Sequence, residues 1–176
     1  MATTIKIFDL DDTLFDTKEA VIEAYRVAGA KDARKYWGKP WQEWCPGFIH
    51  QQKNHLYPGI LALKIKPGWA YDFYCNASER GQEIGILTGA SKEAVEAVQD
   101  LTKIPRLPIL TGFSLTTEEK NIAIRTIESF YENKLDMFSI VYFDDNPKLG
   151  LEVVRNTRNV HLITPETDTT IYRGIL

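Results

Sequence analysis

The stretch "IFDLDDTLFDT", residues 7–17, carries four aspartates within eight positions directly behind a short apolar run. They are Asp9, Asp11, Asp12 and Asp16. Carboxylates this close repel one another unless a positive group lies among them, and a hard divalent cation such as Mg²⁺ binds carboxylate oxygens. Asp9 and Asp11 could then divide the work, one attacking phosphorus as a nucleophile and the other transferring a proton. The stretch therefore indicates phosphoryl-transfer chemistry.

Polar groups that suit the same chemistry follow later in the chain. Thr88 could donate a hydrogen bond to a phosphoryl oxygen, and Lys120 could offset the negative charge of a nucleophile and a phosphate. Phosphoryl transfer needs little beyond such positioning and charge stabilisation. The later candidates are Thr88, Gly89, Lys120, Asp144 and Asp145.

The elements that must position these groups alternate along the chain. β-Branched and aromatic runs that end in a polar residue predict strands, and apolar residues three or four apart predict helices. Strands are expected at residues 4–8, 83–87, 107–110, 139–143 and 160–163, and that at 107–110 is weaker because Pro108 lacks a ladder donor. Helices are expected at about 17–29, 69–77, 91–101, 117–131 and 149–154, with Ser91 and Thr117 as N-caps of the third and fourth.

This alternation predicts a parallel sheet covered by helices. In such a sheet all strands point their carboxyl ends to one edge, where ligands bind. Asp9, Thr88 and Asp144 each follow a predicted strand directly, and Lys120 lies near the start of a helix that follows another. We therefore expect these side chains to converge on one site.

Four segments carry a family resemblance. "FDLDDTL" at 8–14, "IGILTGAS" at 84–91, "TTEEKNIAI" at 116–124 and "IVYFDDNP" at 140–147 resemble, in order, the four motifs of the haloacid dehalogenase-like superfamily of phosphatases. The resemblance covers the chain from residue 5 to about residue 155, apart from an insertion. The expected fold class is then α/β: a Rossmann-like parallel sheet with helices on both faces, plus a small, mainly helical cap.

The resemblance also implies roles for single residues. Asp9 would be the nucleophile, and Asp11 the general acid/base whose backbone carbonyl also binds Mg²⁺. Thr88 would bind phosphate and Lys120 would stabilise its charge. The implied metal ligands are Asp9, Asp11, Asp144 and Asp145, and Gly89 joins Thr88 and Lys120 in binding the substrate.

Residues 17–66, called the cap below, exceed what a minimal connection between two strands requires. We expect a catalytic core at 1–16 and 67–176, and the resemblance implies that the cap closes over the site and sets substrate choice. The cap holds Trp37, Trp41 and Trp44. Trp41 or another of these tryptophans, or Tyr36 or Tyr57, could stack on the base of a nucleoside monophosphate, or the tryptophans could simply form the cap's core.

Other interpretations stay open for several residues. Asp12 and Asp16 suit helix caps or turns better than catalysis, and Thr88-Gly89 could be an ordinary turn. An EF-hand calcium loop is excluded because its glycine and final glutamate are missing. Lys120 could be an exposed lysine replaced in the site by Lys103 or Lys148. In the cap, His50 and His55 could bind metal or substrate, and Arg34, Lys35 and Lys53 could attract phosphate or merely aid solubility.

Composition narrows the classes of function. The 176 residues include 21 basic and 24 acidic side chains, for a net charge of -3, which lacks the basic footprint of a protein that binds extended nucleic acid. Two cysteines, no signal-like segment and no long apolar run suggest a cytoplasmic protein without a membrane span. The oligomeric state stays open.

The interpretation that unites these features is a Mg²⁺-dependent phosphatase acting on a small phosphorylated metabolite. A phosphatase for a nucleic-acid 3'-phosphate or a phosphoprotein, and a non-catalytic binding protein of the same fold, remain as alternatives. Dehalogenation is disfavoured because that reaction has no evident use for Asp11 or for an acidic metal site.

Overall fold

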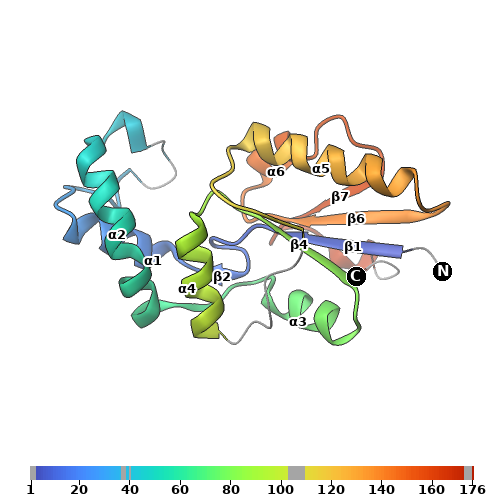
Figure 1. Cartoon of the computed structure of the whole chain (residues 1–176), viewed down its shortest axis with the longest axis horizontal. Helices are drawn as coiled ribbons and strands as arrows, with labels where there is room; N and C mark the ends of the chain where they lie inside the picture. The colour runs from blue at the N-terminus through green and yellow to red at the C-terminus, as the bar shows by residue number, and fades with distance from the viewer. Residues whose placement is uncertain (1–2, 37–38, 40, 103–109, 173–175) are drawn as a thin grey trace.

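The computed structural model describes residues 3–36, 39, 41–102, 110–172 and 176. Within them, five strands form a parallel sheet in the order β5-β4-β1-β6-β7 (Figure 1). These strands are β1 Thr3–Phe8, β4 Glu83–Leu87, β5 Leu110–Gly112, β6 Phe138–Phe143 and β7 Val160–Ile163. The central strand β1 is buried along most of its length, so the first acidic stretch leaves the sheet at its middle.

Helices cover both faces of this sheet. They are α3 Tyr71–Glu79, α4 Lys92–Thr102, α5 Thr117–Glu132 and α6 Pro147–Val153. In Figure 1, α5 and α6 lie on one side of the sheet and α3 on the other. Side chains alternate between the faces: Ile5 and Ile7 of β1 pack with Ile124 of α5, whereas Phe8 packs with Tyr74 of α3. The predicted α/β class with helices on both faces is confirmed.

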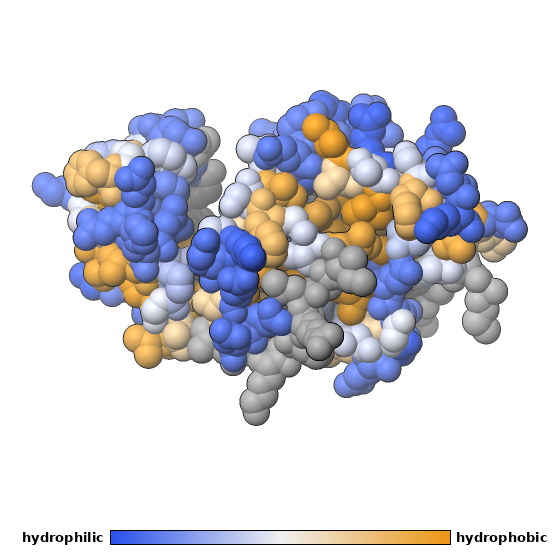
Figure 2. Space-filling model, viewed as in Figure 1, coloured by the Kyte–Doolittle hydropathy of each residue, from blue (hydrophilic) through white to orange (hydrophobic). Residues whose placement is uncertain are grey.

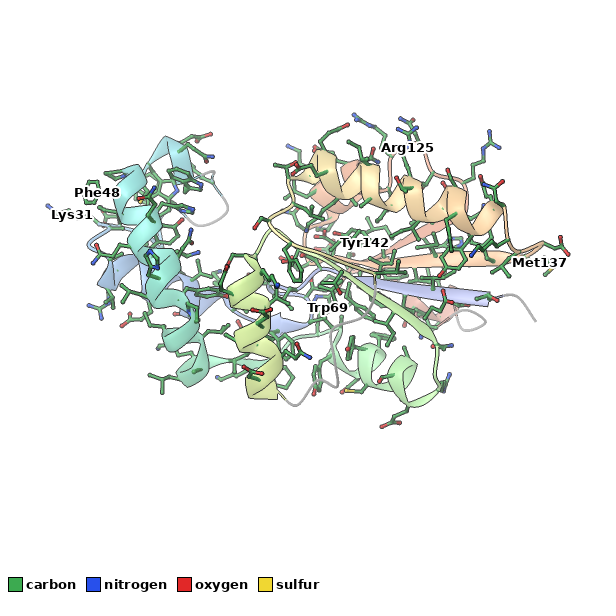
Figure 3. All side chains as sticks on the ribbon, in the orientation of Figure 1. Lys31, Phe48, Trp69, Arg125, Met137 and Tyr142 are labelled. Atoms are coloured by element: carbon green, nitrogen blue, oxygen red, sulfur yellow. The ribbon has the colours of Figure 1, made fainter. Side chains whose placement is uncertain are left out.

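The aromatic side chains show where the two cores lie. Tyr142 of β6 lies between the sheet and α5, whereas Phe48 points outward from the cap (Figure 3). The Phe8 ring stacks on Phe143 of the neighbouring strand at 4.5 Å, at the end of β1 where Asp9 follows. Tight packing at this point fixes the direction in which the acidic loop leaves the sheet.

The cap contains α1 Lys18–Val27, the short 3-10 helix η1 Trp41–Glu43 and α2 Gly47–Lys64. Helices α1 and α2 pack against each other beside the carboxyl edge of the sheet, and α2 also packs along α4 (Figure 1). Strands β2 Phe15–Asp16 and β3 Lys66–Pro67 pair antiparallel at the two ends of this segment. That pairing brings the exit from the core and the return to it side by side, which is the geometry that an inserted segment requires.

Several helix starts differ from their predicted positions, and α3 begins at Tyr71 rather than at about residue 69. The N-cap of α5 is Thr116 rather than Thr117: its Oγ1 accepts the backbone N–H of Glu119 at 3.2 Å, and Glu119 accepts the N–H of Thr116 at 2.8 Å. Helix α6 begins at Pro147, two residues before the predicted start at 149. The fixed φ of proline favours the first helical position, but the prediction used only the spacing of apolar residues. Ser91 is confirmed as a cap, accepting the N–H of Ala94 at 3.3 Å.

Part of one expected strand cannot be compared. The strand predicted at 107–110 lies mostly outside the described residues, which resume at Leu110 as the start of β5. Among the helices in the described residues, none has both the length and the apolar character that crossing a membrane would require.

Candidate active site

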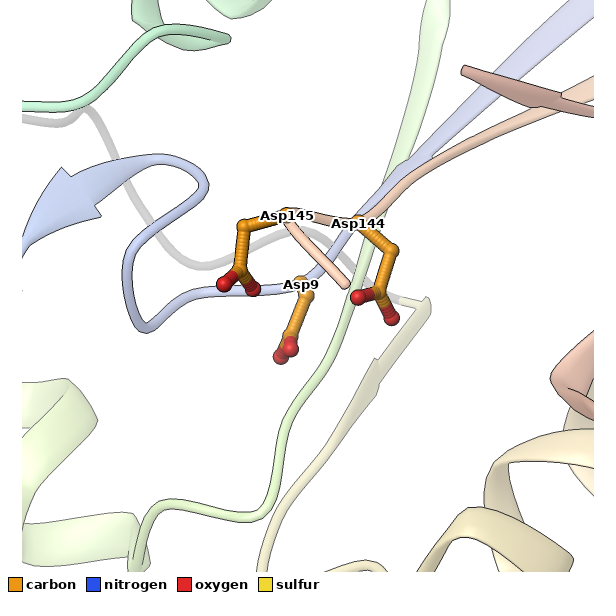
Figure 4. Close-up of side chains that lie close together, drawn as sticks. All are labelled: Asp9, Asp144 and Asp145. Carbon is orange, nitrogen blue, oxygen red and sulfur yellow. The ribbon is translucent and has the colours of Figure 1, made fainter. Parts of the chain in front are cut away.

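Three carboxylates meet at the carboxyl edge of the sheet. Asp9 follows β1, and Asp144 and Asp145 follow β6. One carboxylate oxygen from each residue lies within 4.8 Å of those of the other two, and Figure 4 shows the three side chains pointing to the same side. Neighbouring parallel strands that end together produce this meeting of residues far apart in sequence, as the sequence predicts.

Lys120 joins this group from the first turn of α5. Its Nζ lies 2.9 Å from Oδ1 of Asp9, and the two side chains are only 10% and 14% exposed. The backbone N–H of Leu10 donates to the same oxygen at 2.8 Å. Burying two charges costs a desolvation free energy that is about as large as their attraction, so a buried ion pair adds little to stability. Its presence here therefore indicates a functional role. Of the alternative lysines, Lys148 is exposed and Lys103 lies outside the described residues.

Burial and mutual repulsion disfavour the charged forms of these acids. Burial raises the pKa of Asp9 to about 7; Lys120 opposes that rise, and Asp144 and Asp11 add to it. Burial, and then the charges of Asp144 and Asp12, raise the pKa of Asp145 to about 6. Three carboxylates facing one ammonium group thus leave negative charge uncompensated, and oxygen ligands with this excess charge fit Mg²⁺.

Asp144 is held in place by neighbours on both sides. Its Oδ2 accepts the hydroxyl of Tyr142 at 2.8 Å, and its Oδ1 accepts the backbone N–H of Asn146 at 2.9 Å. The side chain of Asn146 in turn caps α6. Such supporting bonds orient a carboxylate before any ligand arrives.

We expect Asp145→Asn to stabilise the metal-free protein by about 1–3 kcal/mol at pH 8, or about 3–9 °C in Tm. The pKa of Asp145 is raised in the folded state, so the unfolded chain ionises first as pH rises from about 4, and the penalty is complete above about pH 6. The gain should shrink as pH falls from 6 to 4. Thermal unfolding in EDTA across this range measures it, and an equal gain at every pH would contradict the assignment.

Asp11 lies apart from the three carboxylates and faces the cap. Its Oδ1 accepts the hydroxyl of Thr17 at 2.7 Å and that of Tyr57, from α2, at 3.2 Å. The side chain is therefore not placed as a metal ligand, and only its backbone carbonyl could serve in that way. Asp12, with a left-handed φ of 57°, accepts the backbone N–H groups of Thr17 and Lys18 and so caps the start of α1. Asp16 is exposed in β2.

Thr13, which the sequence analysis did not single out, ties the first acidic loop to the last. It is fully buried, and its Oγ1 accepts the backbone N–H of Asp145 at 2.9 Å. The same hydroxyl lies 3.5 Å from Oδ1 of Asp145. The available signal was a threonine two residues after Asp11 inside the first motif, but nothing local in the sequence names its partner.

Thr88 lies in a turn after β4, which is the alternative interpretation of Thr88-Gly89 given by the sequence analysis. It is fully buried, and its Oγ1 accepts the backbone N–H of Ala90 at 3.0 Å. The main chain of Thr88 also bonds to Gly112 and Leu115, which fixes the loop after β4. Thr88 lines neither of the two cavities described next, whereas Gly89 lines the cap cavity.

Two cavities meet at Asp11. The carboxylate cavity, of about 280 Å³, is lined by Asp9, Asp11, Lys120, Asp144 and Asp145 among others. The cap cavity, of about 390 Å³, lies between α2 and the loop after β4, and its lining includes Asp11, His50, Lys53, Tyr57, Gly89 and Ser91. The space-filling view shows the molecule hollowed between the cap and the core (Figure 2). A small molecule could thus reach from the carboxylates into the cap.

Two of the cap tryptophans, Trp41 and Trp44, pack against other aromatic rings of the cap. Trp41 stacks on the ring of His50, with the centroids 4.0 Å apart and the planes 10° from parallel, and it does not line the cap cavity. Trp44 stacks on Tyr36 at 5.5 Å and tilts against Tyr25. One face of the Trp41 ring is therefore used in packing, and its contact with substrate stays a prediction. Trp37 lies outside the described residues.

Comparison with solved structures identifies the fold. No family model and no curated protein matches the sequence. CbbY from Rhodobacter sphaeroides, solved in complex with phosphate, is 16% identical over 96% of this chain and 90% of its own, with a TM-score of 0.69. A Thermotoga maritima protein provisionally described as a beta-phosphoglucomutase is 18% identical over all of both chains, with a TM-score of 0.63.

A third solved structure adds a bound ligand. A HAD family hydrolase from Deinococcus radiodurans, with bound phosphate and sodium, is 11% identical over 97% of this chain and 87% of its own, with a TM-score of 0.58. At these identities the likeness shows the fold. The chain therefore has the fold of the haloacid dehalogenase-like hydrolases, as the four motifs predict.

Proposed function

We propose that the protein is a Mg²⁺-dependent phosphatase that hydrolyses small phosphomonoesters through an aspartyl-phosphate on Asp9. The observation that carries this proposal is the placement of Asp9. Its carboxylate contacts Lys120 at 2.9 Å and lies in one group with Asp144 and Asp145 at the carboxyl edge of the sheet. Solved proteins of the same fold, named as hydrolases or bound to phosphate, support this interpretation.

In the first step a carboxylate oxygen of Asp9 attacks phosphorus. A bond forms between that oxygen and phosphorus as the bond from phosphorus to the ester oxygen breaks. Lys120 stabilises the negative charge on the nucleophile and the phosphoryl group, and Asp11, in its protonated form, gives its proton to the leaving alcohol oxygen. This role is supported by the fact that Asp11 lines both the carboxylate cavity and the cap cavity.

In the second step the roles reverse. Asp11, now a carboxylate, takes a proton from water, and the water oxygen attacks the phosphorus of the aspartyl-phosphate. The bond to Asp9 breaks, releasing inorganic phosphate and the free carboxylate. Asp9, Asp144, Asp145 and the backbone carbonyl of Asp11 would hold Mg²⁺, which when bound neutralises charge on the phosphoryl oxygens.

The cap cavity supports a compact substrate. Its volume of about 390 Å³ suits a small molecule, and polar side chains line much of it. A nucleoside monophosphate would need an aromatic ring face for its base. Trp41 and Trp44 stack on His50 and Tyr36, and Tyr57 is buried with the ammonium group of Lys53 over its ring. We therefore propose that the substrate is a small polar phosphate ester rather than a nucleotide.

Phosphate release from a panel of small phosphomonoesters, with Mg²⁺ and with EDTA, tests the proposal. We expect EDTA to lower the rate at least about 100-fold and added Mg²⁺ to restore it, because uncompensated carboxylates would otherwise repel the phosphate. Release that ignores EDTA would contradict the metal site. No release from any ester by folded protein would favour a macromolecular phosphate or a binding role.

A further inference from the structure

One face of α2 lines the cap cavity. The residues on it are His50, Lys53, Asn54 and Tyr57. Their spacing of three, four and seven residues from the first is that of neighbours on one side of a helix. This face is polar along most of its length, so it is suited to recognising a polar group.

Lys53 supplies the positive charge on this face. Its Nζ lies 4.8 Å from the ring centroid of Tyr57 and 5.3 Å from that of Tyr25, and it donates to Oδ1 of Asn54 at 3.2 Å. Among the described residues it makes no ion pair. Two aromatic rings and a neutral amide hold the ammonium group at the cavity wall without neutralising it.

The other charged residue lining the cavity, Asp11, compensates Lys53 only in part: its charge raises the pKa of Lys53, but the larger effect of burial lowers it. The carboxylate of Asp11 already accepts the hydroxyls of Thr17 and Tyr57, and Asp11 also lines the carboxylate cavity. His50 is held by the hydroxyl of Tyr25, 2.7 Å from its Nδ1, and by the stacked ring of Trp41. Burial, and then the charge of Lys53, lower the pKa of His50, so this ring is neutral near pH 7.

The opposite wall of the cavity contains a helix start, where the carboxylate of Glu93 already bonds to the N-cap residue. It includes the first turn of α4, an eleven-residue helix whose N-cap, Ser91, lines the cavity with Ala94. The N-terminus of a helix carries partial positive charge. A group placed in the cap cavity would thus lie between an ammonium group and a helix N-terminus.

We propose that the cap cavity binds the alcohol part of a phosphomonoester that carries a second anionic group, a carboxylate or another phosphate, and that Lys53 binds this group. The inference rests on the proposed function, because it assumes that the scissile phosphate lies among the carboxylates beyond Asp11. It narrows the substrate class from small esters to small esters with two anionic ends.

A matched series of substrates tests this inference. Alkyl phosphates of two to six carbons would carry a hydroxyl, a carboxylate or a second phosphate at the far end. We expect kcat/KM to be at least about 10-fold higher for the anionic members, and Lys53→Met to lower their kcat/KM by about 10- to 100-fold, far more than that of the hydroxyl members. Lys53→Arg should keep the preference, and the control Lys64→Met, on an exposed lysine of the same helix, should change nothing.

The outcomes separate the two proposals. Hydrolysis of all members without preference, or a preference that survives Lys53→Met, would overturn the role of Lys53 and leave the phosphatase standing. Should no ester be hydrolysed, calorimetry with the corresponding non-hydrolysable phosphonates decides the inference by itself. Equal affinity for hydroxyl-ended and carboxylate-ended phosphonates would overturn it, and a preference lost in Lys53→Met would support it.

Discussion

Asp9→Asn is expected to lower kcat for phosphomonoesters by at least about 10⁴-fold without unfolding the protein. The substitution replaces the attacking carboxylate by an amide of the same size. The amide oxygen can still accept from Lys120, which lies 2.9 Å from Oδ1 of Asp9, and from the N–H of Leu10. The loss should therefore reflect the missing nucleophile rather than a disturbed loop.

The measurement is phosphate release under saturating Mg²⁺, with circular dichroism and thermal unfolding to verify the fold. Asp16→Asn is the matched control, since Asp16 belongs to the same acidic stretch but is exposed in β2. It should retain full activity. If Asp9→Asn kept more than a hundredth of the wild-type rate, Asp9 would not be the nucleophile, and if it failed to fold, the aspartate would be structural.

Trapping the intermediate gives a second readout of Asp9. Acid quenching of the wild-type protein during turnover of a labelled phosphate ester should leave label on the protein, and hydroxylamine should remove it, as it cleaves acyl phosphates. The Asp9→Asn variant should carry none. Label found on a peptide without Asp9 would assign the nucleophile to another side chain.

The convergence of Asp9, Asp144 and Lys120 could be predicted because it needs only local patterns and one rule of topology. Each acid directly follows a strand of the parallel sheet, and Lys120 lies in the first turn of a helix that follows another. Parallel strands bring such positions to one edge of the sheet, and this does not depend on the detailed conformation of the loops. The same rule explains why errors at helix starts, such as that of α5, did not displace the site.

The contacts inside the cap could not be predicted in this way. Whether Trp41 faces a cavity or a neighbouring ring depends on how α1, η1 and α2 pack, and composition does not determine that. Thr13 was missed for a related reason, since its partner Asp145 lies 132 residues away. The helical spacing of His50 and Lys53 was visible, but the cavity that gives it meaning was not.

Asp11→Asn is expected to lower kcat for alkyl phosphates by about 10²–10⁴-fold, because an asparagine cannot protonate the leaving oxygen. The loss should be much smaller in the first step for an aryl phosphate such as p-nitrophenyl phosphate, whose leaving group needs no proton. The amide oxygen can still accept the hydroxyls of Thr17 and Tyr57, so the link between the acidic loop and the cap should persist. Rapid-quench kinetics with both ester types measure this contrast.

The same variant also separates the two halves of the reaction. With the aryl ester, Asp11→Asn should still form the aspartyl-phosphate but hydrolyse it slowly, because the base that takes the proton from water is gone. Hydroxylamine-sensitive label should therefore accumulate on Asp9 above the wild-type level, whereas Asp9→Asn accumulates none. An equal loss with both ester types and no accumulation would mean that Asp11 acts by holding the loop and the cap in place, through its bonds to Thr17 and Tyr57, rather than by moving a proton.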